Sequence, residues 1–165
     1  MSRGFVKEED QEEIPVIPPR AALPDGVPNY VTQSGYEALL QEKTALEEER
    51  RNLPSENEGE RRRSALFIDG KLKLLLERIA SARILDTKSQ SPDEVRFGAT
   101  VEFFNGKKNL CYQIVGADEA DIKKKKIAFT APIARSLIGK KINETANFKL
   151  GNQIQKLKIL KISYL

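Results

Sequence analysis

Residues 65–82, which read ALFIDGKLKLLLERIASA, carry the pattern that decides the fold of this 165-residue chain. Apolar side chains recur there at alternating intervals of three and four residues, at Ala65, Ile68, Leu72, Leu75, Ile79 and Ala82. These intervals place them along one stripe of an α-helix, like the seam of a coiled coil. The stripe predicts a helix that packs lengthwise against a second helix, although a helix inside a globular core would show the same pattern.

A partner helix is predicted directly upstream. Ser34-Gly-Tyr-Glu37 matches a capping box, in which the two end residues bond free backbone amides, so this helix is expected to begin at Ser34. Tyr36 occupies an early core position, and Pro54 should end the helix. Between them, leucines recur every seven residues, at Leu39, Leu46 and Leu53.

The second helix has a start signal of its own. Ser55-Glu-Asn-Glu58 is a second capping box, and it follows the expected stop at once. Two such helices with a short bend between them favour an antiparallel hairpin. Residues 31–86 are therefore predicted to form a coiled-coil hairpin about 30 Å long, with its tip at about residues 52–61.

From residue 95 onward the apolar pattern alternates with a period of two, which is typical of strands. Asn105-Gly106 predicts a tight turn, and a change of parity in the last strand predicts a β-bulge near Ile159. Residues 95–165 are thus predicted to be a small antiparallel β-rich domain behind a linker at 87–94, which makes the fold α+β. Strands are expected at 99–104, 110–115, 127–129, 145–150 and 153–164, with one short helix at 132–138.

The first 30 residues form an acidic, proline-rich segment. They hold five of the eight prolines in the chain, and acidic residues cluster between positions 8 and 13. Because proline lacks an amide hydrogen and has a fixed φ, an extended arm is predicted over 1–30. Whether this arm drapes over a domain or stays disordered is left open by the sequence, and so is its role.

The composition excludes several classes of protein. No apolar run approaches the roughly 20 residues of a membrane span. A single cysteine, Cys111, allows no internal disulfide, which favours a reducing cytoplasm. The chain has no histidine, so the usual nucleophilic triad is absent. The formal net charge is −4 over 1–86 and +8 over 87–165, which indicates two modules with different partners.

Several short stretches together resemble the bacterial GreA/GreB family of transcript-cleavage, or elongation, factors. The resemblance covers about residues 30–165 and identifies the chain as a divergent member, with a shortened coiled coil and an altered tip. It rests on FGATVE at 97–102, IVGADEAD at 114–121, APIARSLIGK at 131–140, TQSGYEAL at 32–39, SEN at 55–57 and RILD at 83–86.

The resemblance implies an architecture and a mode of action. The C-terminal domain is expected to have a sheet like that of FK506-binding proteins and to dock on the rim of the secondary channel of RNA polymerase. The coiled coil is expected to enter that channel, where acidic residues at its tip help to hold a magnesium ion in the polymerase active site. The docking residues that the resemblance implies are Asp118, Glu119, Asp121, Ala131, Pro132, Ile133 and Arg135.

A factor of this kind acts on the catalytic site of polymerase, so no intrinsic enzymatic activity is expected. It binds no cofactor alone and shares Mg²⁺ with polymerase. RNA polymerase is the expected partner of a cytoplasmic monomer, with only indirect contact to RNA or DNA. Neither a membrane nor a small-molecule substrate is expected.

The tip departs from the family pattern. Leu53 stands where the resemblance predicts an aspartate, and the helices are shorter than usual, which favours a factor that binds polymerase without promoting cleavage. Glu56 and Glu58 are the candidate magnesium ligands. The alternative is that the tip charges only stabilise helix ends. The tip residues are Glu56, Asn57, Glu58, Glu60, Arg61, Arg62 and Arg63.

Two other functions stay open. A nucleic-acid-binding protein that acts without polymerase would use the basic C-terminal half, where Lys123–Lys126 form either a phosphate contact or a solvated connection. An FKBP-like binding module would need an apolar, aromatic pocket, and this chain has no tryptophan. Whether the effect on transcription is activating or inhibitory does not follow from the sequence.

Overall fold

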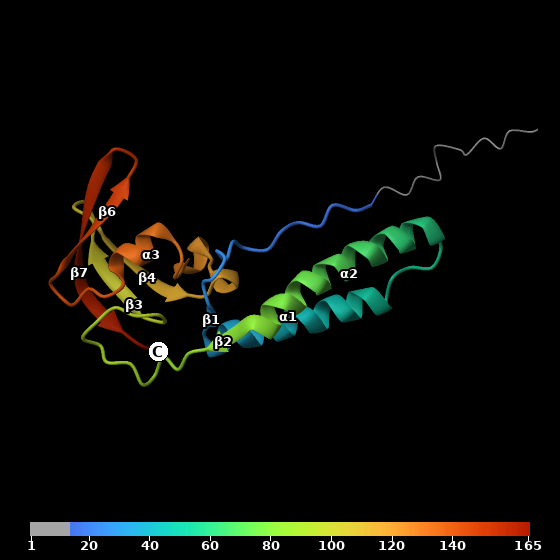
Figure 1. Ribbon diagram of the computed structural model, residues 1–165, viewed down its shortest axis with the longest axis horizontal. Coiled ribbons are helices and arrows are strands. Elements are labelled where there is room, and N and C mark those ends of the chain that lie inside the picture. The colour runs from blue at the N-terminus through green and yellow to red at the C-terminus, as the bar shows by residue number, and fades with distance from the viewer. Residues whose placement is uncertain (1–13) are drawn as a thin grey trace, which may run out of the picture.

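Two long helices lie side by side at one end of the molecule, and a curled sheet forms the other end (Figure 1). The computed structural model describes residues 14–165, so the acidic cluster at 8–13 lies outside the described residues. Helix α1 spans Gln33–Arg51 and helix α2 spans Glu58–Ser81. At 1.5 Å per residue they are about 29 Å and about 36 Å long.

The predicted stripe of α2 meets the leucines of α1. Each fully buried aliphatic side chain in this seam contributes about 1.5–3 kcal/mol to folding. The seam accounts for why two helices with otherwise charged surfaces pack together. Its buried members are Leu39, Leu46, Ile68 and Leu75, and Leu53, Leu72 and Ile79 pack against them.

Both helices begin at a different residue from the one predicted. The N-cap of α1 is Thr32, whose hydroxyl accepts a hydrogen bond from Gly35 N at 2.9 Å. The N-cap of α2 is Asn57, whose amide oxygen accepts from Glu60 N at 3.1 Å. The capping boxes predicted at Ser34 and Ser55 are therefore wrong. At the start of α1, Thr32 is buried just before the first helical residue, and its hydroxyl is the cap. At the start of α2 the cap is Asn57, and asparagine caps helices as well as serine does.

The base of the two helices is held by a strand pair that the sequence pattern did not indicate. Strand β1, Asn29–Val31, pairs in parallel with β2, Ala82–Ile84, which follows α2 directly. Helix α2 therefore ends at Ser81, and Ala82 at the end of the predicted stripe belongs to a strand. The buried Asn29 amide donates to Arg78 O at 3.0 Å and so satisfies a carbonyl of the last helical turn.

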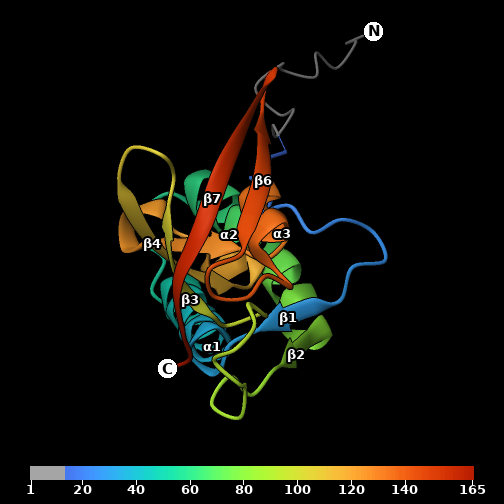
Figure 2. The same ribbon diagram turned by 90° about the vertical axis from the view of Figure 1, so that its left-hand side faces the viewer.

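The second sheet has five strands in the order β5-β4-β3-β7-β6. All neighbours are antiparallel except β4 and β5, and β6 and β7 form a ribbon that extends beyond the rest of the sheet (Figure 2). Mixed α and β structure is thus confirmed. The strands are β3 at Thr100–Phe104, β4 at Asn109–Val115, β5 at Lys126–Ala128, β6 at Thr145–Leu150 and β7 at Gln153–Ser163.

The predicted bulge lies where the parity of β7 changes. Glu102 pairs with Lys161, but Phe103 pairs with Ile159, so Leu160 is the extra residue. The bulge lets side chains on both sides of it enter one core. That core lies between the sheet and helix α3, Pro132–Leu137, and its largest fully buried members are Phe103, Ile114, Leu137, Leu157, Ile159, Val95 and Val101.

The turn between β3 and β4 is longer than predicted. Phe104 pairs with Asn109, which leaves a four-residue loop. Only Gly106 takes a positive φ there, while the Asn105 side chain accepts hydrogen bonds from Lys107 N and Lys108 N, both at 2.9 Å. Asn105 therefore organises the loop through its side chain, and its backbone N–H also donates to Lys108 O at 3.1 Å. Among the described residues, no helix is long and apolar enough to cross a membrane.

The observed cap of α2 predicts how two neighbouring substitutions differ. Asn57→Ala removes the acceptor for Glu60 N, so the free energy of unfolding should fall by about 1 kcal/mol. Ser55→Ala removes a hydroxyl that does not cap the helix, so the free energy of unfolding should change by less than about 0.5 kcal/mol. Urea unfolding followed by circular dichroism measures the free energy of unfolding of both variants. A larger loss in Ser55→Ala than in Asn57→Ala would support the capping box at Ser55.

Candidate functional site

The turn between α1 and α2 forms the exposed tip of the hairpin. Leu53 turns inward against the seam, while Glu56, Glu58 and Glu60 are exposed. Because Asn57 caps α2, Glu58 is the first helical residue and its carboxylate is not used for capping. Glu58 and Glu60 lie in the first helical turn, where negative charge is favourable.

The tip glutamates have free carboxylates. No hydrogen bond or ion pair involves the side chain of Glu56 or Glu58 within residues 14–165. Within the same residues, no group of three potential metal-ligating side chains forms a metal centre. Exposed carboxylate oxygens are ligands that Mg²⁺ accepts while it keeps several waters. The carboxylates of Glu56 and Glu58 are thus exposed at the tip, and their role as magnesium ligands stays a prediction.

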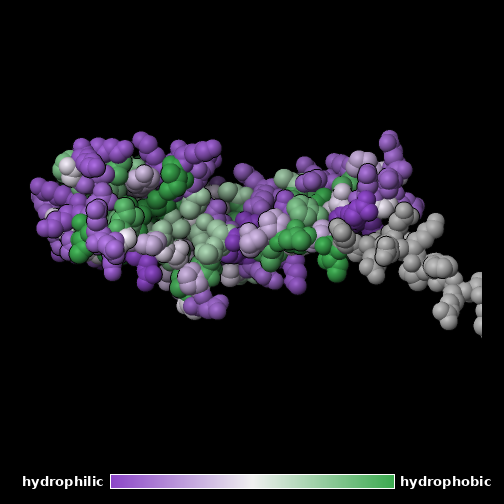
Figure 3. Space-filling view, turned by 90° about the horizontal axis from the view of Figure 1, so that it is seen from above, coloured by the Kyte–Doolittle hydropathy of each residue, from purple (hydrophilic) through white to green (hydrophobic). Residues whose placement is uncertain are grey.

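The three arginines of the tip follow on the first turns of α2. Arg61, Arg62 and Arg63 are all exposed, and hydrophilic side chains dominate this end of the molecule in Figure 3. Arg63 lines a shallow hollow with Leu53 and Phe67. The tip is thus a charged surface beside a small apolar depression, with both signs of charge within one helical turn.

Two of the residues predicted for docking lie instead in the joint between the hairpin and the sheet. The side chains of Asp118 and Glu119 are 6% and 10% exposed. Both belong to a 3₁₀ turn, Ala117–Glu119, that follows β4. Both carboxylates are buried and paired inside the molecule, and the role of the two residues in docking stays a prediction.

Glu119 joins the start of α1 to the sheet. It accepts a hydrogen bond from the Thr32 hydroxyl at 2.6 Å, and Lys126 Nζ lies 3.2 Å from its other oxygen. A Cβ on Gly35 would lie 2.6 Å from Glu119 Oε2, so the missing side chain of Gly35 admits this carboxylate. Asp121, the third acid of the group, accepts from Lys123 N at 3.0 Å and caps the next 3₁₀ turn.

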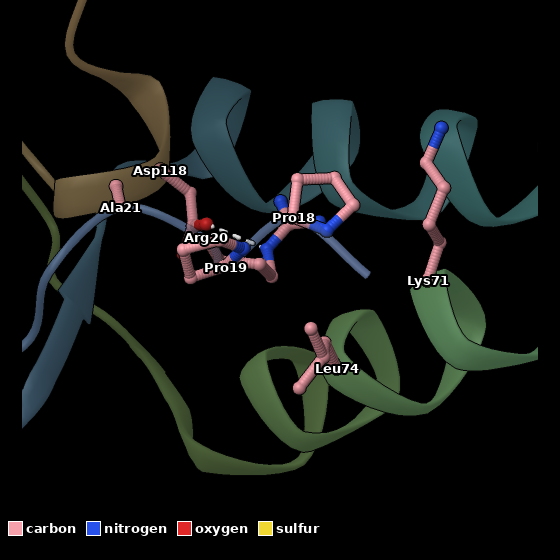
Figure 4. A pocket seen from close by; sticks show the side chains of 7 residues that line it. All are labelled: Pro18, Pro19, Arg20, Ala21, Lys71, Leu74 and Asp118. Atoms are coloured by element: carbon pink, nitrogen blue, oxygen red, sulfur yellow. Dashed lines mark hydrogen bonds and ion pairs between the residues drawn. The ribbon is translucent and has the colours of Figure 1, made fainter. Parts of the chain in front are cut away.

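Asp118 is held by two arginines that come from different elements. Arg20 Nε lies 2.8 Å from Asp118 Oδ1, as Figure 4 shows, and Arg78 of α2 lies 3.4 Å from Oδ2. The remaining nitrogens of Arg20 bond both oxygens of Glu42 on α1, at 2.8 and 3.0 Å. Sequence reasoning missed Arg20 and Glu42, because a lone arginine after two prolines gives no local signal of its partners.

The paired charges shift each other's titration. The hydrogen bond to Glu42 is the largest cause of the raised pKa of Arg20, and burial opposes it. The same bond to Arg20 lowers the pKa of Glu42 below its ordinary value of 4.5, again against the effect of burial. Both partners are therefore stabilised in their charged forms.

Aromatic side chains form the apolar part of the joint. The ring centroid of Tyr30 in β1 lies 6.0 Å from the ring centroid of Phe97 and 5.7 Å from that of Phe129. Phe97 and Phe129 are 5.5 Å apart and meet edge to face. Gly116 lets β1 approach, since a Cβ there would lie 2.6 Å from Tyr30 O. The joint thus has an aromatic centre flanked by buried ion pairs.

The other residues predicted for docking lie on or beside α3. Pro132 and Arg135 are exposed, whereas Ala131 and Ile133 are half-buried against the sheet core. Proline at the first helical position costs the helix no hydrogen bond. Of the seven residues predicted for docking, Pro132 and Arg135 are the ones on this helix that present fully accessible side chains.

Comparisons with known proteins agree on one family. Residues 89–164 match the family model described as "Transcription elongation factor, GreA/GreB, C-term". Transcription elongation factor GreA of Trichlorobacter lovleyi is 32% identical over 151 residues, which cover 81% of this chain and 96% of that protein. GreA of Acidiphilium cryptum is 46% identical over 83 residues, which cover 49% of this chain and 53% of that protein.

The extent of the matches differs between relatives. The chain spans nearly all of the first GreA protein but only between 53% and 64% of the next four. A solved structure from Nitrosomonas europaea, titled prokaryotic transcription elongation factor GreA/GreB, is 21% identical. It covers 82% of this chain and 98% of its own, with a TM-score of 0.41.

The lowered pKa of Glu42 predicts a pH dependence of stability. A carboxyl with a lower pKa in the folded state stabilises the fold above its unfolded pKa, and this contribution is lost as pH falls through the folded pKa. Glu42→Gln should therefore lower the free energy of unfolding by up to about 1 kcal/mol at about pH 7 and by a smaller amount at about pH 3.

Urea unfolding at the two pH values measures this difference. Glu47→Gln is the matched control, because within residues 14–165 the Glu47 carboxylate pairs only with Lys43, one turn away on the same helix. A loss in Glu42→Gln that is the same at both pH values would contradict the ion pair with Arg20.

Proposed function

Because the chain belongs to the GreA/GreB family of transcription elongation factors, we propose that it binds RNA polymerase at the rim of the secondary channel and regulates elongation there. The observation that carries this proposal is the match to a GreA protein over 96% of that protein's length. Polymerase is the partner, the factor is a monomer in the cytoplasm, and the chemistry takes place in the polymerase active site. The factor itself has no enzymatic activity.

The hairpin would be the part that enters the channel. Helices of 19 and 24 residues make a narrow rod whose tip carries acidic and basic side chains together. In this proposal the seam is that of a coiled coil, and the five-stranded sheet with α3 corresponds to the FKBP-like docking domain. The arginines at the tip are suited to RNA phosphate or to acidic groups of the polymerase.

We place polymerase docking on the exposed side of α3. Pro132 and Arg135 are accessible there, next to the half-buried Ala131 and Ile133. Asp118 and Glu119 would support this surface from behind, since their carboxylates are already paired within the joint. A rigid element with a few exposed side chains is a better docking surface than a buried acid whose pairing must first be broken.

Stimulation of transcript cleavage is not expected. A second metal in the polymerase active site would stabilise the attacking and leaving oxygens. Glu56 and Glu58 are free to contribute a ligand, but Leu53, at the position where an aspartate is expected, packs into the seam. With one carboxylate missing and short helices, the tip is suited to occupying the channel more than to completing a metal site.

Binding of nucleic acid without polymerase is the competing function. The run Lys123–Lys125 is exposed and would serve it. Lys126 is already paired with Glu119. Affinity that rests on phosphates falls steeply as salt rises, whereas docking on α3 does not depend on the lysine run.

The first test scores transcript cleavage. Backtracked elongation complexes with the polymerase of the same organism are incubated with the factor, and RNA lengths are read on a gel. We expect no more shortened RNA than with polymerase alone, both for the wild type and for Glu56→Ala, Glu58→Ala and Glu60→Ala. Cleavage that is lost in one glutamate variant would show that the tip still supplies a magnesium ligand.

A second test separates docking from general charge. Arg135→Glu should weaken binding to polymerase by about tenfold, which corresponds to about 1.4 kcal/mol. Lys124→Glu is the matched control, because it reverses one equally exposed charge in the same domain and should leave affinity unchanged. Equal losses in both variants would favour the nucleic-acid alternative, and no binding by the wild type would remove the polymerase proposal altogether.

A further inference from the structure

The N-terminal segment 14–22 lies along the hairpin instead of leaving the molecule (Figure 1). It has no regular secondary structure, and over residues 14–17 exposed and half-buried side chains alternate. Ile14 and Val16 are 88% and 87% exposed, whereas Pro15 and Ile17 are half-buried. Pro15 lines the hollow near the tip, and Ile17 lines a groove along α2.

Helix α2 has a glycine where Ile17 packs. A Cβ on Gly70 would lie 2.5 Å from Ile17 Cδ1 and 2.6 Å from Ile17 Cγ1. Glycine in a helix interior is unfavourable relative to alanine, because it loses more backbone entropy on folding. Its presence at position 70 is explained by the space that Ile17 occupies.

Arg20, near the end of the segment, contacts both the hairpin and the part of the chain beside the sheet. Arg20 bonds Glu42 on α1 with two nitrogens and Asp118 beside the sheet with the third. Its side chain is 17% exposed and that of Asp118 is 6% exposed. Arg78 of α2 contacts Asp118 and also donates to Ala21 O. Arg20 thus ties α1 to the sheet, and the carbonyl of Ala21 ties the segment to α2. Figure 4 shows the Arg20–Asp118 contact of this arrangement.

We propose that residues 14–22 are an intramolecular strap that sets the orientation of the hairpin relative to the sheet. Prolines at 15, 18 and 19 restrict the free segment to extended conformations, so it loses little freedom when it docks. The packing of Ile17 on Gly70 fixes the position of the strap along α2. The bonds of Arg20 to Glu42 and Asp118 hold the strap across the joint between the hairpin and the sheet. Release of the strap leaves Asp118 and Arg78 accessible and frees the hairpin to change its angle. This inference does not depend on what the protein binds.

The orientation can be measured between two spin labels on the full-length chain. Cys111 is the only cysteine and is exposed on β4, and Ser55→Cys adds a label site at the exposed tip. Arg20→Gln should broaden the distance distribution at least about twofold, because the strapped orientation no longer dominates the population.

Arg50→Gln is the matched control for this measurement. It breaks the Arg50–Asp69 ion pair, at 2.9 Å, which joins the two helices but does not reach the sheet. Its distribution should keep the width of the unsubstituted pair. A narrow distribution in Arg20→Gln, or equal broadening in both variants, would overturn the strap.

A second variant releases the strap without removing a charge. Gly70→Ala places a methyl group against Ile17, so trypsin should cleave the Arg20–Ala21 bond at least about fivefold faster, since cleavage follows the population of the open form. The readout is the rate at which the new N-terminus at Ala21 appears in mass spectrometry.

Gly59→Ala is the control for proteolysis. Its Cβ would have only ordinary contacts, the nearest at 3.4 Å, so cleavage should stay at the wild-type rate. An unchanged rate in Gly70→Ala, with only a rise in Tm from the better helix former, would mean that Ile17 does not hold the segment on α2 and would overturn the proposal.

Discussion

The hydrogen bond from the Thr32 hydroxyl to Glu119 is the contact that anchors the start of α1 to the sheet, and the rest of the joint is built around this anchor. At 2.6 Å it is short, and it is made where both side chains are largely buried. The same hydroxyl accepts from Gly35 N, so one oxygen both starts α1 and attaches it to the sheet. Because an unpaired carboxylate in this position would be costly, the start of the helix and the position of the sheet are fixed together.

The regular parts of the fold could be predicted from the sequence because each rests on a repeated signal. The predicted stripe has six members, five of which lie in α2, and the strands of the sheet show their alternation over several residues each. Even the bulge at Leu160 followed from a change of parity in β7. Single polar residues were harder to assign. Ser34 and Ser55 matched the capping pattern, yet Thr32 and Asn57 are the caps. Thr32 is held by the distant Glu119, and asparagine caps helices as well as serine does.

In the candidate site, too, features with a local sequence pattern could be predicted, and contacts between distant residues could not. The exposure of the tip glutamates could be predicted, because a polar run between two helices has to lie in solvent. The burial of Asp118 could not, since its partners Arg20 and Arg78 are 98 and 40 residues away along the chain. Nor did any local pattern indicate the strand pair of β1 and β2, whose three residues each are too short to show a period. Contacts between segments far apart in sequence leave no trace in local periodicity.

Gly70 also has an evolutionary consequence. A glycine there is a disadvantage to a hairpin without residues 14–22, because alanine would make the bare helix more stable. The glycine is an advantage only where the N-terminal segment is present to fill the space. The residue at position 70 and the segment 14–22 are therefore expected to change together. A related chain without residues 14–22 can replace the glycine at no cost. A chain that keeps residues 14–22 but gains a side chain at position 70 loses the packing of Ile17 on α2.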